Sequence, residues 1–113
     1  YGSQIELILA NNDDMALGAI DAYRESSVAA PPIFGIDGTK PGLTAVREGS
    51  LTGTVRNDSE GQAKAMLSLA LSLSTGEKCA YPLTEGRYIR LPYEPITAAS
   101  LSSMTERSGA VSR

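Results

Sequence analysis

The segment Leu7–Gly18 constrains the fold of this chain more than any other, because it passes from an apolar run through a short polar turn directly into a helical pattern. Two further junctions of this kind follow, at Gly35–Thr39 and at Thr54–Asp58. In each of them, polar side chains stand at the carboxyl end of a predicted strand. In open α/β sheets this edge is where small polar ligands bind. The three junctions therefore predict polar groups that face one cleft.

The alternation of strand and helix patterns indicates the α/β class. Residues 5–10 are almost continuously apolar, which is typical of a strand buried on both faces of a parallel sheet. The predicted strands are 5–10, 33–36 and 51–55, and the predicted helices cover about 13–26, 41–48 and 59–74. This order implies a parallel sheet flanked by helices, with right-handed crossovers.

Helical periodicity predicts which side chains face the core. The inward set expected for the first helix is Met15, Ala16, Ala19, Ile20, Ala22 and Tyr23. The inward set expected for the last helix is Ala63, Met66, Leu67, Ala70, Leu71 and Leu73.

The end of the chain has a different pattern. Residues 87–93 alternate between polar and apolar, which predicts an edge or crossing strand. From about Thr97 the sequence is rich in Ser, Ala and Thr without a clear period. We expect this last segment to be a loosely held tail.

The composition excludes several classes of function. The 113 residues are 42% hydrophobic, which suits one ordinary globular domain. The net charge of −3 argues against nucleic-acid binding, because no stripe of Lys and Arg is present to neutralise phosphates. With Cys79 as the only cysteine and no histidine, neither an intrachain disulfide nor a His/Cys metal site can form. No apolar run is long enough to span a bilayer.

The amino-terminal end indicates a fragment. The chain begins at Tyr1 without an initiator methionine and enters the first predicted strand within a few residues. We therefore expect it to be part of a longer protein, and the missing signal peptide carries no information about its location.

Four segments together carry a resemblance to a known family: Ala10–Ile20, Phe34–Thr39, Gly53–Asp58 and Gln62–Ala65. They resemble the carboxyl-terminal part of the bacterial galactose/glucose-binding proteins, which are sugar-binding components of ABC transporters. The resemblance covers roughly residues 5–95, and the spacings between the segments also fit that family.

The resemblance implies a domain organisation. Members of that family have two α/β lobes joined by three hinge strands, and sugar binds between the lobes. Residues 1–57 would then be part of the carboxyl-terminal sugar-binding lobe of a periplasmic-binding-protein type I fold. Residues 58–90 would belong to the other lobe, and 91–113 would hold a return strand and the carboxyl-terminal tail.

The resemblance also implies that the sugar is held partly by Asn12, Asp37 and Asn57. An ionised carboxylate accepts hydrogen bonds from two neighbouring hydroxyls, and an amide both donates and accepts, so these residue types suit a sugar. Each residue also has a plainer explanation. Asn12 would cap a helix, Asp37 would start a turn with Gly38, and Asn57 would be a turn or cap residue.

Three further acidic residues lie near the first junction. We expect Asp13 and Asp14 to interact favourably with the positive end of the first helix. The resemblance matches Glu6 to the glutamate that completes the family's calcium loop. That loop is not in this chain, and one carboxylate cannot supply the six to eight oxygens that calcium takes. Glu6 is therefore a calcium ligand of the full-length protein, a salt-bridge member or an exposed residue at the strand end.

The resemblance implies a non-enzymatic, extracytoplasmic binding protein. It would deliver a monosaccharide to the permease of an ABC importer, with a galactose- or glucose-like hexose expected before a ribose-like pentose. The role requires no cofactor, and calcium would enter only through the full-length protein. The protein would lie in the periplasm or, as a lipoprotein, at the cell surface. It would meet the membrane only through a lipid anchor or the permease.

Three alternatives share some of these features. The effector domain of a LacI-type transcription repressor resembles the segment around Asn12, but residues 47–55 look like the transport proteins. A sugar sensor that docks a chemoreceptor or a kinase shares the same binding segments. A phosphatase of the haloacid dehalogenase type is disfavoured, because Gly35 stands where its nucleophilic aspartate would be.

Overall fold

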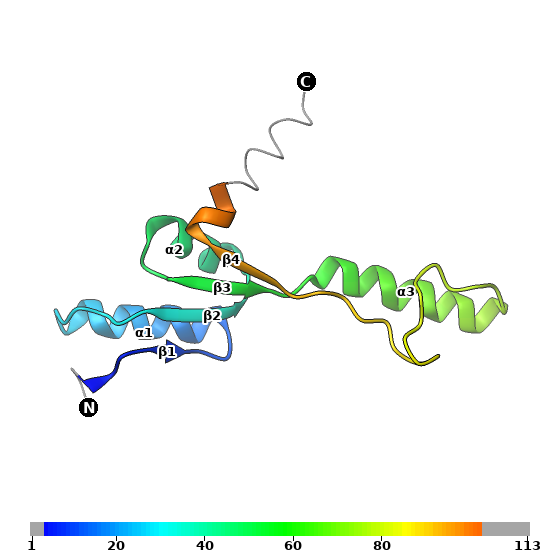
Figure 1. The fold of residues 1–113 in the computed structure, drawn as a ribbon, viewed down its shortest axis with the longest axis horizontal. Coiled ribbons are helices and arrows are strands. Elements are labelled where there is room, and N and C mark those ends of the chain that lie inside the picture. The colour runs from blue at the N-terminus through cyan, green and yellow to red at the C-terminus, as the bar shows by residue number, and fades with distance from the viewer. Residues whose placement is uncertain (1–3, 103–113) are drawn as a thin grey trace, which may run out of the picture. The chain divides into compact units, whose positions relative to one another are not determined.

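Strands and helices alternate along the chain in the computed structural model, which describes residues 4–102 (Figure 1). The strands are β1 (Ile8–Leu9), β2 (Ile33–Asp37), β3 (Gly53–Arg56) and β4 (Glu94–Thr97). The helices are α1 (Asp13–Glu25), α2 (Lys40–Glu48) and α3 (Ser59–Thr75). The predicted α/β class is confirmed. The chain divides into two compact units, Tyr1–Asn57 with Glu94–Arg113, and Asp58–Tyr93.

The first unit is built on a sheet with the strand order β1-β2-β3-β4. Strands β1, β2 and β3 are parallel, as predicted, and β4 lies antiparallel to β3 at one edge. The β3–β4 register pairs Thr54 with Ile96 and Val55 with Pro95. An edge strand can contain Pro95 because it needs ladder hydrogen bonds on one side only.

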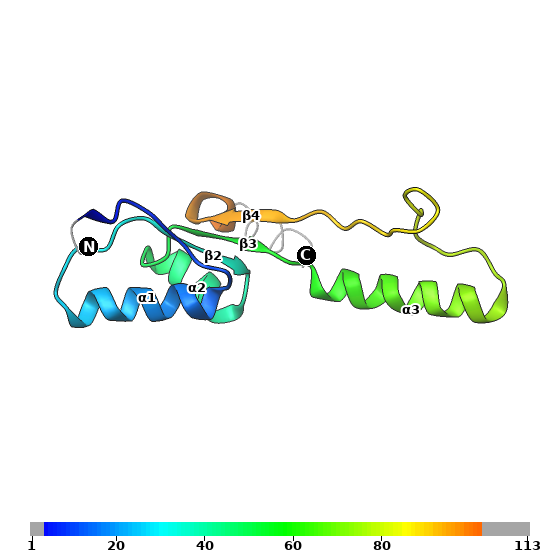
Figure 2. The same ribbon diagram turned by 90° about the horizontal axis from the view of Figure 1, so that it is seen from below.

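Helices α1 and α2 both pack on one face of this sheet (Figure 2). The buried cluster between helices and sheet consists of Ala16, Ile20, Ile33, Ala45, Val46 and Leu51. Because side chains alternate across a strand, Ile33 of β2 points toward the helices and Ile36 toward the opposite face, where it is exposed.

Strand β1 is shorter and more exposed than the sequence predicts. It spans only Ile8–Leu9, and Leu9 is 73% exposed. The prediction of a strand over residues 5–10 buried on both faces is wrong. The reason is that β1 is an edge strand, and nothing within residues 4–102 covers the side of the sheet on which Leu9 lies.

Side-chain caps and a glycine set the helix ends of the first unit. Asn12 Oδ1 accepts a hydrogen bond from Met15 N–H at 2.9 Å and caps α1. Thr39 caps α2, since its Oγ1 accepts from Gly42 N–H at 3.2 Å. Helix α2 stops at Gly49, as predicted, because the φ of +80° at that residue is the left-handed conformation that glycine adopts without steric cost.

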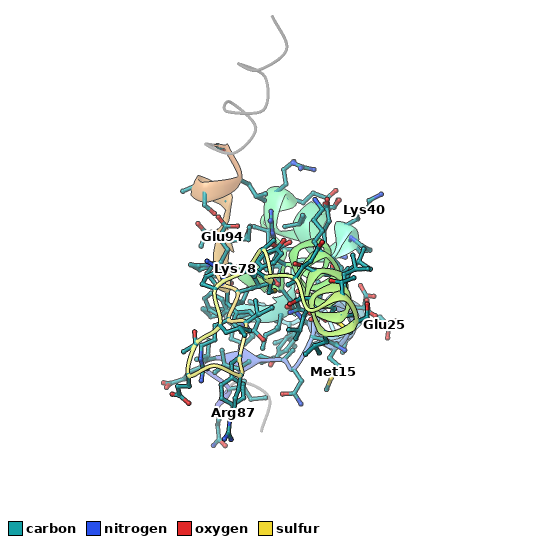
Figure 3. The ribbon with its side chains drawn as sticks, turned by 90° about the vertical axis from the view of Figure 1, so that its right-hand side faces the viewer. Met15, Glu25, Lys40, Lys78, Arg87 and Glu94 are labelled. Atoms are coloured by element: carbon teal, nitrogen blue, oxygen red, sulfur yellow. The ribbon has the colours of Figure 1, made fainter. Side chains whose placement is uncertain are left out.

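The inward face of α1 is narrower than predicted, because Met15 and Ala22 are both exposed. Ala16 and Ile20 are buried, but Met15 is 56% exposed and projects away from the helix (Figure 3). The inward row is Asp13, Ala16 and Ile20, at positions i, i+3 and i+7, and Met15 lies outside it. A polar residue therefore takes the inward position at the first turn.

The second unit consists of α3 and the segment that follows it. Ala65 is the buried residue of α3, whereas Leu67, Leu71 and Leu73 are exposed, so the predicted inward face of this helix is wrong. The apolar residues of α3 form a wider stripe than the following segment can cover. No helix within residues 4–102 has both the length and the apolar character needed to cross a bilayer.

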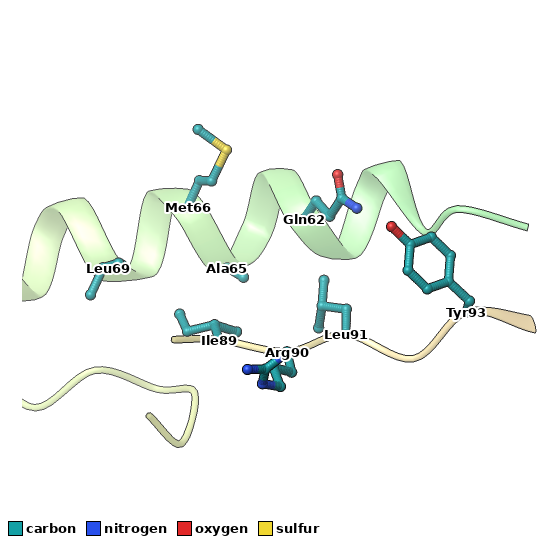
Figure 4. A pocket seen from close by; sticks show the side chains of 8 residues that line it. All are labelled: Gln62, Ala65, Met66, Leu69, Ile89, Arg90, Leu91 and Tyr93. Atoms are coloured by element: carbon teal, nitrogen blue, oxygen red, sulfur yellow. The ribbon is translucent and has the colours of Figure 1, made fainter. Parts of the chain in front are cut away.

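The strand predicted at 87–93 is not present, and the last strand is β4 instead. Ile89 and Leu91 line a groove together with Ala65 and Leu69 of α3 (Figure 4). The alternation of residues 87–93 therefore reflects packing against a helix rather than pairing in a sheet.

The tail predicted from about Thr97 is wrong in its first part. Thr97 ends β4, and residues 98–102 are helical. The rest of that prediction falls outside the described residues.

We expect Leu51→Ala to lower the free energy of unfolding by about 2–5 kcal/mol, because Leu51 is 1% exposed in the core of the first unit. The matched control Leu9→Ala should change it by no more than about 0.5 kcal/mol, since Leu9 is exposed. Urea unfolding followed by circular dichroism measures both. An equal loss in the two variants would contradict the exposed sheet face.

Candidate functional site

The structure brings the three predicted site residues to one edge of the sheet. Asp37 is the last residue of β2, and Asn57 directly follows β3, the parallel neighbour of β2. The Asn57 N–H donates to the Asp37 carbonyl oxygen at 3.3 Å, so the two residues lie side by side. Asn12 follows β1, the other parallel neighbour of β2, and opens α1. All three therefore stand at the carboxyl edge of the parallel strands, where the sequence predicts a binding site.

Asp37 has an unusual backbone conformation. Its φ of +106° lies in a region that residues with a side chain rarely adopt. Such strain persists only where the surroundings hold it, and it concentrates at functional sites. Within residues 4–102 no hydrogen bond or ion pair involves the Asp37 carboxylate, and the residue is half-buried. Its acceptor oxygens are therefore available to a ligand.

Asn12 has the structural role that the plainer explanation gave it, since it is the cap of α1. The cap uses Oδ1, which accepts from Met15 N–H. Within the described part of the chain, no hydrogen bond is donated by Asn12 Nδ2. An amide that caps with its oxygen can still donate to a ligand with its nitrogen.

The turn between Asp37 and α2 packs closely on β3. Gly38 has a φ of +66°, and its N–H donates to Thr54 Oγ1 at 3.3 Å. A Cβ on Gly38 would lie 3.1 Å from the Cα of Arg56, so a side chain there would be in tight contact with β3. Arg56 forms an ion pair with Glu94 across the β3–β4 ladder, with 3.8 Å between Nε and Oε2.

Asp13 has a role that the sequence did not predict. Asp13 and Asp14 both lie in the first turn of α1, as expected, but Asp13 is 0% exposed while Asp14 is exposed. Asp13 Oδ2 accepts from the N–H and the Oγ1 of Thr39, at 2.7 and 2.9 Å. Asp13 Oδ1 accepts from Thr54 Oγ1 at 2.6 Å. The carboxylate thus joins all three junctions.

Two glycines make room for the Asp13 carboxylate. A Cβ at Gly35 would collide with Asp13 Oδ1, and a Cβ at Gly42 would collide with Asp13 Oδ2. The sequence signal for a buried Asp13 was therefore a set of glycines and threonines spread over the other two junctions and helix α2. That set has no fixed local spacing, which is why the pattern of the first junction alone does not show it.

Glu6 does not belong to this edge. It is exposed and precedes β1, and no ion pair involving it is found within residues 4–102. No group of three or more Asp, Glu, His or Cys residues that could hold a metal ion occurs in the described part of the chain. These residues do not form a calcium site by themselves, and a calcium-binding role for Glu6 stays a prediction.

The backbone of Asp37 generates a stability prediction. A residue with a Cβ pays a steric cost at positive φ that glycine avoids. Asp37→Gly should therefore have a free energy of unfolding about 1 kcal/mol higher than that of Asp37→Ala. Chemical denaturation of the two variants, which both lack the carboxylate, isolates the backbone effect. Equal stability of the two variants would show that residue 37 is not held in this conformation.

Comparison with known proteins identifies the family. Residues 1–78 match the model of the family described as periplasmic binding protein domain. The D-galactose/methyl-galactoside binding periplasmic protein MglB of Haemophilus influenzae is 40% identical over 98 residues, covering 80% of this chain and 28% of that protein. The putative rhizopine-binding protein of Rhizobium meliloti is 38% identical over 103 residues, covering 89% of this chain and 31% of that protein.

A solved structure agrees with these relatives. The crystal structure of a twin-arginine translocation pathway signal protein from Burkholderia phytofirmans matches with a TM-score of 0.77 and 31% identity, over 97% of this chain and 35% of that one. The chain thus spans about a third or less of the proteins it matches. The family model covers more than half of the chain, and the resemblance drawn from the motifs is confirmed. The chain belongs to the periplasmic binding protein family.

Proposed function

We propose that this chain is part of an extracytoplasmic sugar-binding protein of an ABC importer, and that Asn12, Asp37 and Asn57 form one wall of its sugar site. The observation that carries the proposal is the strained Asp37 at the carboxyl edge of the sheet, hydrogen-bonded through its backbone to Asn57. The names of its relatives, which bind galactose or xylitol, support a polyhydroxylated ligand.

The chemistry of the three residues suits such a ligand. The Asp37 carboxylate accepts only, so it can receive hydrogen bonds from two adjacent hydroxyl groups. The amides of Asn12 and Asn57 donate and accept, so they set the orientation of further hydroxyls. A sugar of the wrong configuration would leave one of these groups desolvated without a partner, at a cost of about 1–3 kcal/mol. Specificity then arises from pairing rather than from the strength of any single contact.

The mechanism would be a shift between open and closed forms. A ligand that contacts both walls of a cleft stabilises the closed form, because it has more contacts there. The permease would recognise that form. We propose a galactose- or glucose-like hexose first and a ribose-like pentose second, since relatives named for galactose and for ribose both match, the former at 40% and the latter at 32% identity. The relatives named above are binding proteins, which favours this role over a repressor or an enzyme.

A thermal-shift panel on the complete gene product tests the proposal. Galactose, glucose, ribose and xylitol are added in turn to the wild type and to Asp37→Ala. A sugar about 100-fold above its Kd should add about 2.7 kcal/mol to the free energy of unfolding and raise Tm. Asp37→Ala should lose that shift, whereas the control Asp21→Ala, an exposed carboxylate paired with Arg24 on α1, should keep it.

Two results would contradict the proposal. If none of the four sugars shifts Tm of the wild type, the protein is not a binding protein for these sugars. If Asp37→Ala keeps the full shift, the sugar does not depend on the Asp37 carboxylate.

A further inference from the structure

The buried carboxylate of Asp13 connects chain segments that lie next to all three proposed site residues. It directly follows Asn12 in the chain. Its partner Thr39 lies two residues after Asp37, and its partner Thr54 lies three residues before Asn57. An ionised carboxylate in a protein interior is unfavourable unless its oxygens are hydrogen-bonded. Here three donors satisfy them.

The hydrogen bonds extend beyond Asp13 in two branches. In one branch, Gly38 N–H donates to Thr54 Oγ1, which donates to Asp13 Oδ1. In the other, Gly42 N–H donates to Thr39 Oγ1, which donates to Asp13 Oδ2. The first branch ends on Gly38, the residue directly after Asp37, and both residues have positive φ. No buried side-chain nitrogen or oxygen within residues 4–102 lacks a partner, so the network is closed.

We infer that Asp13 is a positioning residue, which holds Asn12 and the strained backbone of Asp37 in the geometry that binds the ligand. The inference rests on the proposed function, because it assumes that these residues contact a sugar. Asp13 itself does not touch the ligand. It acts by joining the start of α1, the turn before α2 and strand β3 through one carboxylate, so that the site is formed before the sugar arrives. A site ordered in advance binds more tightly because less ordering occurs on binding.

The first branch passes through Thr54, which is buried, and two substitutions of this residue form a matched pair. Thr54→Val keeps the shape of the side chain but removes the hydroxyl that links Gly38 to Asp13. Thr54→Ser keeps the hydroxyl and removes only the methyl group. A positioning role predicts a sugar Kd about ten- to hundredfold higher in Thr54→Val and close to the wild-type value in Thr54→Ser. A role in packing alone predicts the opposite order of damage.

Titration calorimetry on the complete gene product measures these affinities, with the sugar identified in the thermal-shift panel. Asp13→Ala should raise Kd by a similar factor, because it leaves the Thr39 N–H and the hydroxyls of Thr39 and Thr54 without their acceptor. Leu51→Ala is the control for stability, since it removes a core side chain without touching the network. All titrations are made well below the Tm of each variant. A wild-type Kd in Thr54→Val, or the same increase in Leu51→Ala, would overturn the inference.

A second measurement separates this inference from the proposed function. Amide NMR signals of Asn12, Asp37 and Asn57 are recorded without sugar. They should move in Thr54→Val and stay in place in Thr54→Ser. If the wild type binds no sugar, the proposed function is wrong, and the positioning role is judged by these signals alone. Signals that stay in place in Thr54→Val would overturn the positioning role even in a protein that binds sugar.

Discussion

The first unit of this protein depends on one buried carboxylate. Asp13 is enclosed by two helices and a sheet, where a charge is stable only if its oxygens are paired. Thr39 and Thr54 supply the donors, and the absence of side chains at Gly35 and Gly42 supplies the space. The Asp13 carboxylate therefore links residues from three separate segments of the chain. It accounts for the glycine in β2, for Thr39 as the cap of α2 and for the buried Thr54 of β3.

This interaction connects the fold to the edge where a ligand would bind. The parallel strands bring their carboxyl ends together, and each end continues into a polar turn. Parallel pairing alone would place the turns near one another without fixing their side chains. The Asp13 network links the turns at the level of individual hydrogen bonds. The geometry therefore explains how the three residues proposed for ligand binding are held at this edge.

The strand–helix junctions could be predicted from sequence because their signals are local. An apolar run followed by Asn or Asp and then a helical pattern marked the positions of Asn12, Asp37 and Asn57, and the predicted helix over 41–48 agrees with α2. Features that depend on what lies beside an element could not be predicted. Leu9 is apolar yet exposed, because no described segment covers its side of the sheet.

Contacts with distant parts of the chain also explain why the other predictions failed. The apolar stripe of α3 is wider than its single packed face, so periodicity alone did not identify Ala65 as the buried residue. The alternation around Ile89 resembled a strand because packing against one side of a helix also selects every second residue. The buried hydrogen bonds of Asp13 were not predicted, because its partners are 26 and 41 residues away in the chain.

The backbone at Asp37 also restricts what evolution could place there. Glutamate would offer a ligand the same charge, but its longer side chain tolerates positive φ poorly, so this exchange would disturb the turn. Asparagine tolerates such conformations nearly as well as aspartate. An exchange between these two residues would convert an acceptor-only group into one that donates and accepts, with the same shape and the same turn. The positive φ at residue 37 thus favours one substitution, aspartate to asparagine. That single change could alter the ligand preference of this edge while the backbone is preserved.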